Sequence, residues 1–178
     1  GQTVELCRHS LRQPPIVVAV EHDFDPAGRE DCVPHEEQGF VVWSGRTDAL
    51  GPFLAEHPAR RVQEVAAAKA VDATRGLICD RIIDACAGRG TKTVQLRAEH
   101  PDAQIIAAEP DRDRIADLQQ RTAGDDNVTV VEPRQLDVFE HGGADLLVLD
   151  VPCSNTAVLA RRPEARYRYS LRNTRSVV

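Results

Sequence analysis

An acid and a cysteine stand close together at the end of an apolar stretch of this chain. In ADLLVLDVPCSNT, residues 144–156, the apolar run ends at Asp150, and Cys153 follows after a valine and a proline. A cysteine with a lowered pKa can act as a nucleophile or assist a leaving group. The pair therefore predicts a reaction site, although a free cysteine is more often a small buried residue.

A glycine turn follows an earlier apolar stretch. RIIDACA, residues 81–87, leads into Gly88-Arg89-Gly90 and then into a segment with helical spacing. Two glycines permit a tight turn, and the start of the following helix offers free N–H groups to an anionic or carboxylate-bearing ligand. An ordinary turn between a strand and a helix explains the glycines almost as well.

Glu109 ends the next apolar stretch, 19 residues beyond Gly90. An acid at that place can accept hydrogen bonds from both hydroxyls of a ribose, which favours nucleoside binding. The alternative is an acid that stabilises a helix N-terminus just before Pro110 and Asp111.

Two phosphate-binding motifs do not fit the glycine turn. A P-loop requires glycines where this chain has Cys86 and Thr91. A dinucleotide fingerprint is met at Gly88 and Gly90 but has Thr93 in place of its third glycine. S-adenosylmethionine remains as a ribose-bearing ligand that carries no phosphate.

Strands and helices that could position these residues alternate along the second part of the chain. Apolar runs separated by short helices indicate a parallel sheet covered on both faces, with right-handed crossovers. We expect strands at 81–87, 103–109, 127–132 and 144–150, and helices at 59–76, 91–100 and 111–121.

Residues 1–57 have a less regular pattern of apolar residues. Strands are expected at 16–20 and 39–43, among turn-rich stretches at 23–31 and 44–52. We predict a small N-terminal α+β lobe over 1–57 and a second domain over 58–178.

Composition favours a globular, cytoplasmic chain. Its 178 residues are 42% hydrophobic, and neither an apolar run of membrane-spanning length nor an export leader is present. Five cysteines without a C-x-x-C pair argue against a disulfide framework and a zinc site, so we expect free thiols and no metal. Because the sequence contains no methionine and starts at Gly1, we expect an excerpt of a longer chain. Oligomeric state is not indicated.

The charge of −6 is unevenly distributed. Residues 160–178 carry six arginines against Glu164, a net +5, so the remainder carries −11. With Tyr167 and Tyr169 among them, these arginines could bind phosphates and stack bases, but a solvated helix face is equally compatible. The four candidate RNA-binding residues are Arg161, Arg162, Arg166 and Arg168.

Two motifs carry a family resemblance. DACAGRGTKT followed by DVPCSNTAVLARRPEARYR resembles the Sun/Fmu family of ribosomal RNA cytosine-5 methyltransferases, which has D-x-C-A-A-P-G-G-K-T and D-x-P-C-S-G-T-G-x-x-x-R-x-P. VQEVAAAKAV, residues 62–71, is similar to the helix that precedes them in the family. The resemblance implies a Rossmann-like class I S-adenosylmethionine-dependent methyltransferase fold, here with an incomplete parallel sheet, and an enzyme that modifies RNA, ribosomal RNA above all.

The resemblance also implies roles for individual residues. Asp150 would lie between cofactor and target base, Cys153 would assist release of the methylated product, and Glu109 would hold the ribose. A further acid near the adenine would be Glu132 or Asp137. The methionine end of S-adenosylmethionine would be wrapped by Cys86, Ala87, Gly88, Arg89, Gly90, Thr91 and Lys92.

The chain also departs from the family pattern. Arg89 and Thr91 replace a proline and a glycine, so we expect an altered turn or weaker cofactor binding. The family's attacking cysteine belongs to a T-C-S motif that these residues do not contain. The chain is therefore expected to be either the front part of an enzyme or a catalytically inactive RNA-binding module.

Overall fold

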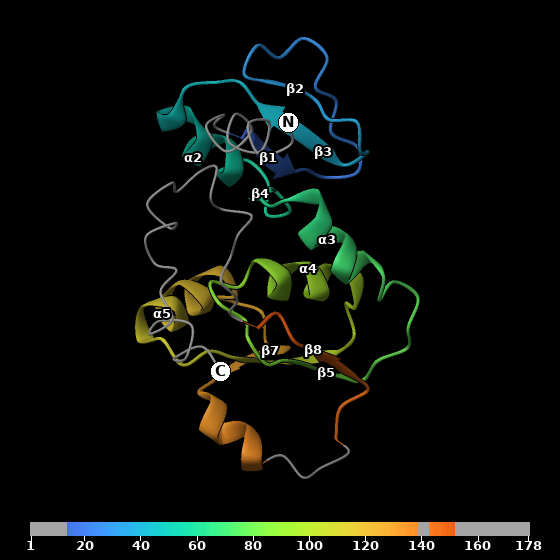
Figure 1. The fold of residues 1–178 in the computed structure, drawn as a ribbon, viewed down its shortest axis with the longest axis vertical. Coiled ribbons are helices and arrows are strands. Elements are labelled where there is room, and N and C mark those ends of the chain that lie inside the picture. Colours follow the sequence, from blue (N-terminus) through green and yellow to red (C-terminus); the bar gives the residue numbers. More distant parts are fainter. Residues whose placement is uncertain (1–13, 139–142, 152–178) are drawn as a thin grey trace, which may run out of the picture. The chain divides into compact units, whose positions relative to one another are not determined.

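The computed structural model describes residues 14–138 and 143–151, and Val17–Asp150 form one compact unit (Figure 1). Its first sheet has the strand order β2-β3-β1-β4, with antiparallel pairing of β2 with β3 and of β1 with β4. The strands are β1 (Ile16–Ala19), β2 (Cys32–Pro34), β3 (Phe40–Trp43) and β4 (Arg61–Val62).

The second sheet is parallel and has the order β7-β6-β5-β8. The chain runs outward from β5 to β7 and then crosses to the other side of β5, so the order reverses between β5 and β8. Ligands of open α/β sheets bind outside the carboxyl ends of the strands at such a reversal. These strands are β5 (Arg81–Asp84), β6 (Gln104–Ala108), β7 (Val128–Val131) and β8 (Leu146–Val148).

Three helices lie along one face of the parallel sheet, and a 3-10 helix lies on the other (Figure 1). Val71 and Leu96 from the first two helices pack with Ile82 and Ile105 of the sheet, which makes the main core of this part. The third helix buries Leu118 against Ala87 and Ala107. The helices are α3 (Val65–Asp72), α4 (Thr91–Glu99), α5 (Arg112–Arg121) and the 3-10 helix η1 (Pro133–Val138).

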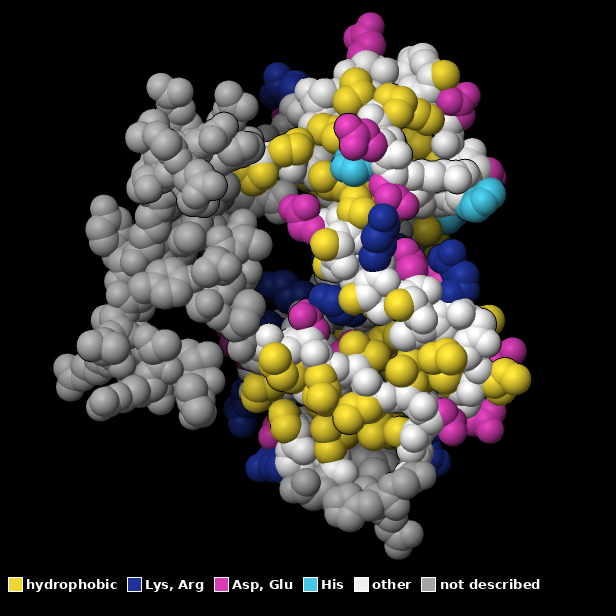
Figure 2. Space-filling view, turned by 45° about the vertical axis from the view of Figure 1, so that its right-hand side comes forward, with side chains coloured by type: hydrophobic (Ala, Val, Ile, Leu, Met, Phe, Trp, Pro, Cys, Tyr) yellow, Lys and Arg dark blue, Asp and Glu magenta, His cyan; other side chains and the backbone are white. Residues whose placement is uncertain are grey.

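On the face that carries η1, the sheet is partly covered. Leu136 of η1 packs with Ile106 and Val131, whereas Leu147 and Leu149 are exposed. Figure 2 shows hydrophobic side chains gathered on the part of the surface that holds this sheet. The Rossmann-like α/β architecture predicted from the sequence is confirmed. Among the described residues, the face of the parallel sheet that carries α3, α4 and α5 is covered more fully than the face that carries η1.

The predicted helix over 59–76 is shorter in the structure. Arg61 and Val62 form β4 and pair with β1, and α3 begins only at Val65. Good helix propensity is overridden here because the extended backbone completes a sheet; the Gln63 N–H, for example, donates to the carbonyl of Val17 at 3.2 Å. The first sheet thus continues past residue 57, and the division into domains stays a prediction.

The turn-rich stretch 44–52 was wrongly assigned, because a helix, α2 (Thr47–Ala55), covers most of it. Gly51 and Pro52 argue against a helix by propensity. The helix is nevertheless anchored by Phe53, which is buried against Trp43 with a ring-centroid distance of 5.0 Å. Tertiary burial therefore outweighs the local preference.

Cys32, Cys79 and Cys86 are free thiols, as predicted, while Cys7 and Cys153 lie outside the described residues. Within the described ranges, no helix has the length and apolar character needed to cross a membrane.

Candidate functional site

The turn after β5 depends on both of its glycines. Gly88 has φ 57° and Gly90 φ 86°, values that side-chain-bearing residues rarely adopt. The Gly90 N–H closes the turn by donating to the carbonyl of Ala87 at 2.9 Å. Gly90 also has no room for a side chain, since a Cβ there would lie 2.6 Å from Cδ1 of Leu118.

Glu109 lies immediately after β6 and connects two loops. Its side chain is buried, with Oε2 accepting from the Gly88 N–H at 3.0 Å and Oε1 accepting from the Asp111 N–H at 2.9 Å. The N-cap of α5 is Asp111, whose side chain accepts from the N–H groups of Asp113 and Arg114. Glu109 therefore braces the glycine turn as well as the start of α5, and each oxygen keeps a second lone pair for a ligand.

Lys92 and Asp150 meet across the point where the strand order reverses. Lys92 is in the first turn of α4, Asp150 follows β8, and Lys92 Nζ lies 2.5 Å from Asp150 Oδ2. The strand ends are held together beside them by the Ala85 N–H, which donates to the carbonyl of Val148 at 3.0 Å. Two residues that the sequence assigned to one site, 58 positions apart, are thus brought together.

Asp84 also lies at this end of the sheet, although no role was predicted for it. It ends β5, its side chain is fully buried, and its Oδ2 accepts from the Thr93 hydroxyl at 2.7 Å. Its Oδ1 makes no hydrogen bond among the described residues. Burial raises the pKa of Asp84, against the opposing effects of the Thr93 hydroxyl, the Cys86 amide and the Lys92 ammonium. Asp84 could have been recognised from the sequence because it is the first residue of the motif DACAGRGTKT.

Cys86 is half-buried within the turn. Burial raises the pKa of its thiol, and the negative charges of Asp84, Glu109 and Asp150 act in the same direction. A cysteine in this setting remains a thiol near neutral pH and is a poor nucleophile. The environment of Cys86 therefore suits a residue that lines the candidate site better than a residue that reacts.

Arg89 forms an ion pair with Asp117 of α5. Arg89 was predicted to lie in the turn, whereas no role was predicted for Asp117. No motif includes Asp117, and helical spacing alone does not tell which residue of α5 faces the turn.

The other predicted residues are less closely tied to this cluster. Glu132 follows β7 and pairs with Arg134 at 2.9 Å. Asp137 belongs to η1 by its backbone. The remaining predicted residues, Cys153, Arg161, Arg162, Arg166 and Arg168, lie outside the described part of the chain.

A surface pocket of about 610 Å³ lies away from this cluster, around the end of α5 and the start of β7. Its Arg97 is already paired with Asp125 at 2.6 Å, and nothing in it points to a ligand. The described residues also contain no group of three His, Cys, Asp or Glu side chains suited to a metal ion. The carboxyl ends of β5, β6 and β8 are therefore the better candidate site.

Comparison with solved structures supports the fold. The structure titled "Crystal Structure of PH0851" aligns with a TM-score of 0.80 and 20% sequence identity, covering 99% of this chain and 44% of that one. At this identity the likeness concerns the fold alone.

Relatives are found among curated proteins. The ribosomal RNA small subunit methyltransferase B of Xanthomonas campestris is 33% identical over 109 residues, which are 58% of this chain and 25% of that protein. The protein of the same name from Photorhabdus laumondii is 28% identical over 110 residues, 60% of this chain and 26% of that protein. The chain spans about a quarter of the length of these relatives.

The family described as 16S rRNA methyltransferase RsmB/F matches residues 78–177, more than half of the chain. The match includes the glycine turn, Glu109, and the Asp150 and Cys153 motif. This chain therefore belongs to the RsmB/F methyltransferase family.

Proposed function

We propose that this chain is the cofactor-binding part of an S-adenosylmethionine-dependent RNA cytosine-5 methyltransferase that acts on ribosomal RNA. The observation that carries the proposal is the meeting of three strand ends at one place. The braced glycine turn follows β5, Glu109 follows β6, and Asp150 follows β8 in contact with Lys92.

The donor set fits S-adenosylmethionine. A left-handed glycine turn brings backbone close to a ligand, and the first N–H groups of α4 suit its carboxylate. The buried Asp84 Oδ1 and the second lone pairs of Glu109 are acceptors for ammonium and hydroxyl groups. Cys86 to Lys92 would hold the methionine end, Glu109 the ribose, and Glu132 or Asp137 the adenine. When bound, this cofactor supplies an electrophilic methyl group.

Carbon 5 of cytosine needs activation before it can accept a methyl group. A thiolate that adds to carbon 6 makes carbon 5 nucleophilic, carbon 5 takes the methyl, and loss of its proton then expels the thiolate. By family resemblance the attacking thiol is that of a T-C-S motif, and Cys153 assists release of the product.

In this proposal Asp150 meets the target base. A base must leave its stack to reach such a site, and a carboxylate can accept from the amino group of cytosine. Lys92, 2.5 Å from Asp150, would keep the carboxylate oriented. The arginines of 161–168 would bind RNA phosphates.

The cofactor assignment is tested by calorimetric titration of S-adenosylmethionine into the chain and into Glu109→Ala. We expect binding to be lost in the variant. Unchanged affinity would refute the site.

The catalytic assignment is tested in the protein that contains this chain, using the Cys153→Ala variant. We expect a covalent adduct with RNA to accumulate, because product release is blocked. Normal turnover without an adduct would refute the release role.

The alternative is a catalytically inactive RNA-binding module. It is favoured by Arg89 and Thr91, which stand where the family pattern has a proline and a glycine. Ultraviolet crosslinking of labelled S-adenosylmethionine, combined with RNA retention at rising salt, separates the two functions. RNA retention without cofactor crosslinking would support the module.

A further inference from the structure

Helix α5 contacts the glycine turn through two consecutive residues. Leu118 is buried and lies so close to Gly90 that a Cβ there would be 2.6 Å from its Cδ1. Asp117 pairs with Arg89, whose side chain is 62% exposed. The turn is therefore held on α5 by an apolar contact on the inside and by an ion pair on the outside.

Arg89 lies between two glycines, which restrain the backbone less than any other residue. The turn is closed by the bond from the Gly90 N–H to the Ala87 carbonyl, and the Gly88 N–H is held by Glu109. The Arg89 N–H donates no hydrogen bond among the described residues, so the ion pair with Asp117 is the restraint that acts on Arg89 itself.

We propose that Asp117 is a positioning residue for the candidate cofactor site. Through Arg89 it holds the glycine turn in the conformation that receives the methionine end of S-adenosylmethionine. This inference rests on the proposed function and extends it to a residue outside the motifs. It also makes cofactor affinity dependent on salt, because an exposed ion pair is screened as ionic strength rises.

Calorimetric titration of S-adenosylmethionine into Asp117→Asn tests the inference. An exposed pair makes a modest contribution, so we expect affinity to fall by about two- to fivefold at low salt. The difference from the parent chain should disappear by roughly 0.5 M salt, where the screening length is only a few ångströms. Asp113→Asn, an identical change one turn earlier on the same helix, controls for net charge, because the ion pair of Arg89 is formed with Asp117.

A rescue variant separates positioning from general damage. Proline fixes φ by its ring and would remove no described hydrogen bond at position 89. We therefore expect Arg89→Pro in the Asp117→Asn background to recover affinity and to lose the salt dependence that the ion pair confers. Failure of the rescue, with affinity lowered equally at all salt concentrations, would overturn the inference.

Amide hydrogen exchange without cofactor gives an independent readout. The Gly90 amide should exchange faster in Asp117→Asn than in Asp113→Asn, because its bond to Ala87 opens more often. If the parent chain binds no S-adenosylmethionine, the proposed function fails, and the exchange rates decide only whether Asp117 restrains the glycine turn. If it binds the cofactor but both variants match it in affinity and exchange, the inference fails and the proposed function stands.

Discussion

The carboxylate of Glu109 accepts a hydrogen bond from the backbone N–H of Gly88 at 3.0 Å, although 21 residues separate them. Glu109 thus fixes the turn that, under the proposed function, would hold one end of the cofactor. The structural reading of this acid is confirmed at the helix start, where its other oxygen accepts from the Asp111 N–H. Its role as a ribose ligand stays a prediction.

Glu109→Gln should therefore weaken both the ligand site and the fold. An amide keeps one acceptor oxygen but turns an NH₂ group toward one of the two N–H donors. We expect loss of about 1–3 kcal/mol in the free energy of unfolding, measured by urea denaturation, together with at least a roughly tenfold loss of S-adenosylmethionine affinity. Glu36→Gln, an exposed position, is the matched control. Equal stability of the two variants would contradict the bracing role.

Gly90→Ala should destabilise the chain more than Gly88→Ala. Both positions have positive φ, which costs an alanine about 1–2 kcal/mol. At Gly90 the new Cβ also meets Leu118, whereas at Gly88 nothing lies within 4 Å. We expect the steric contact to add about 1–3 kcal/mol at Gly90. Adding Leu118→Ala should remove the steric part, and equal losses at the two glycines would show that α5 does not confine the turn.

The parallel sheet was predictable because buried parallel strands are continuous apolar runs. β5 and β6 lie within the predicted stretches, and the predicted α5 differs from the observed helix by one residue. The predicted strand ends and the family resemblance likewise assigned Lys92, Glu109 and Asp150 to one site.

Contacts between elements were harder to predict. Asp117 and Asp84 act through neighbours on other elements, and a pattern of residue types does not report such neighbours. α2 and β4 were missed for a related reason. Packing of Phe53 and pairing with β1, both tertiary effects, override the local preference.

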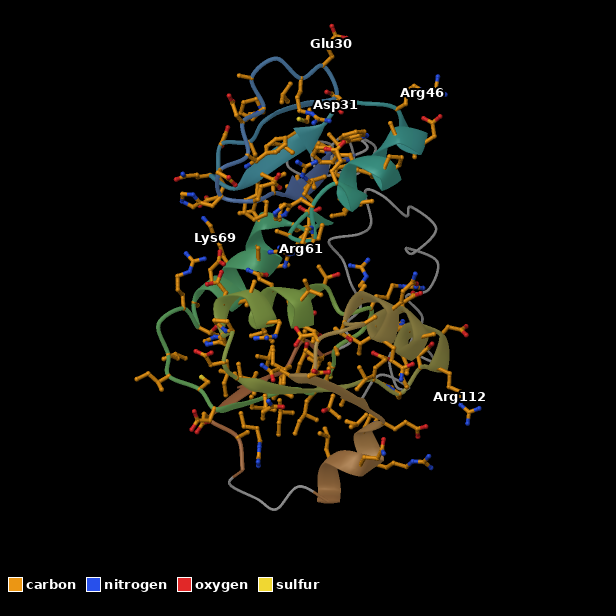
Figure 3. The ribbon with its side chains drawn as sticks, turned by 180° about the vertical axis from the view of Figure 1, so that it is seen from behind. Glu30, Asp31, Arg46, Arg61, Lys69 and Arg112 are labelled. Carbon is orange, nitrogen blue, oxygen red and sulfur yellow. The ribbon has the colours of Figure 1, made fainter. Side chains whose placement is uncertain are left out.

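A buried amide pair links the segment after β4 to α4. Gln63 Nε2 donates to Gln95 Oε1 at 2.8 Å, and Gln95 Nε2 donates to the Ala68 carbonyl at 3.0 Å. Arg61, labelled in Figure 3, donates to the amide oxygen of Gln63 at 2.5 Å.

Gln95→Ala should leave Gln63 buried without its acceptor, at a cost of about 1–3 kcal/mol in unfolding free energy. A double-mutant cycle with Gln63→Ala should show coupling of at least about 0.5 kcal/mol. Gln119→Ala, at an exposed position of α5, is the control. Additive effects of the two substitutions would show that the pair contributes no interaction of its own.

The stability of the fold should depend on pH through Asp84. Burial raises the pKa of this carboxyl in the folded state, so the folded chain binds the proton more tightly than the unfolded chain. Protonation therefore favours folding, and the contribution of Asp84 to stability decreases as pH rises from its unfolded pKa to its raised folded pKa. Above the folded pKa the penalty of the buried charge is constant.

Asp84→Asn removes this titration while an oxygen remains for the Thr93 hydroxyl. The unfolding free energy of the variant minus that of the parent chain should therefore rise with pH across that window and stay level on either side. Urea denaturation between about pH 3 and pH 8 measures the difference. Asp102→Asn, at an exposed turn, should give a smaller change. A difference that falls with pH would mean that the Lys92 ammonium and the hydrogen bonds outweigh burial, and that Asp84 is charged in the folded chain at lower pH than in the unfolded one.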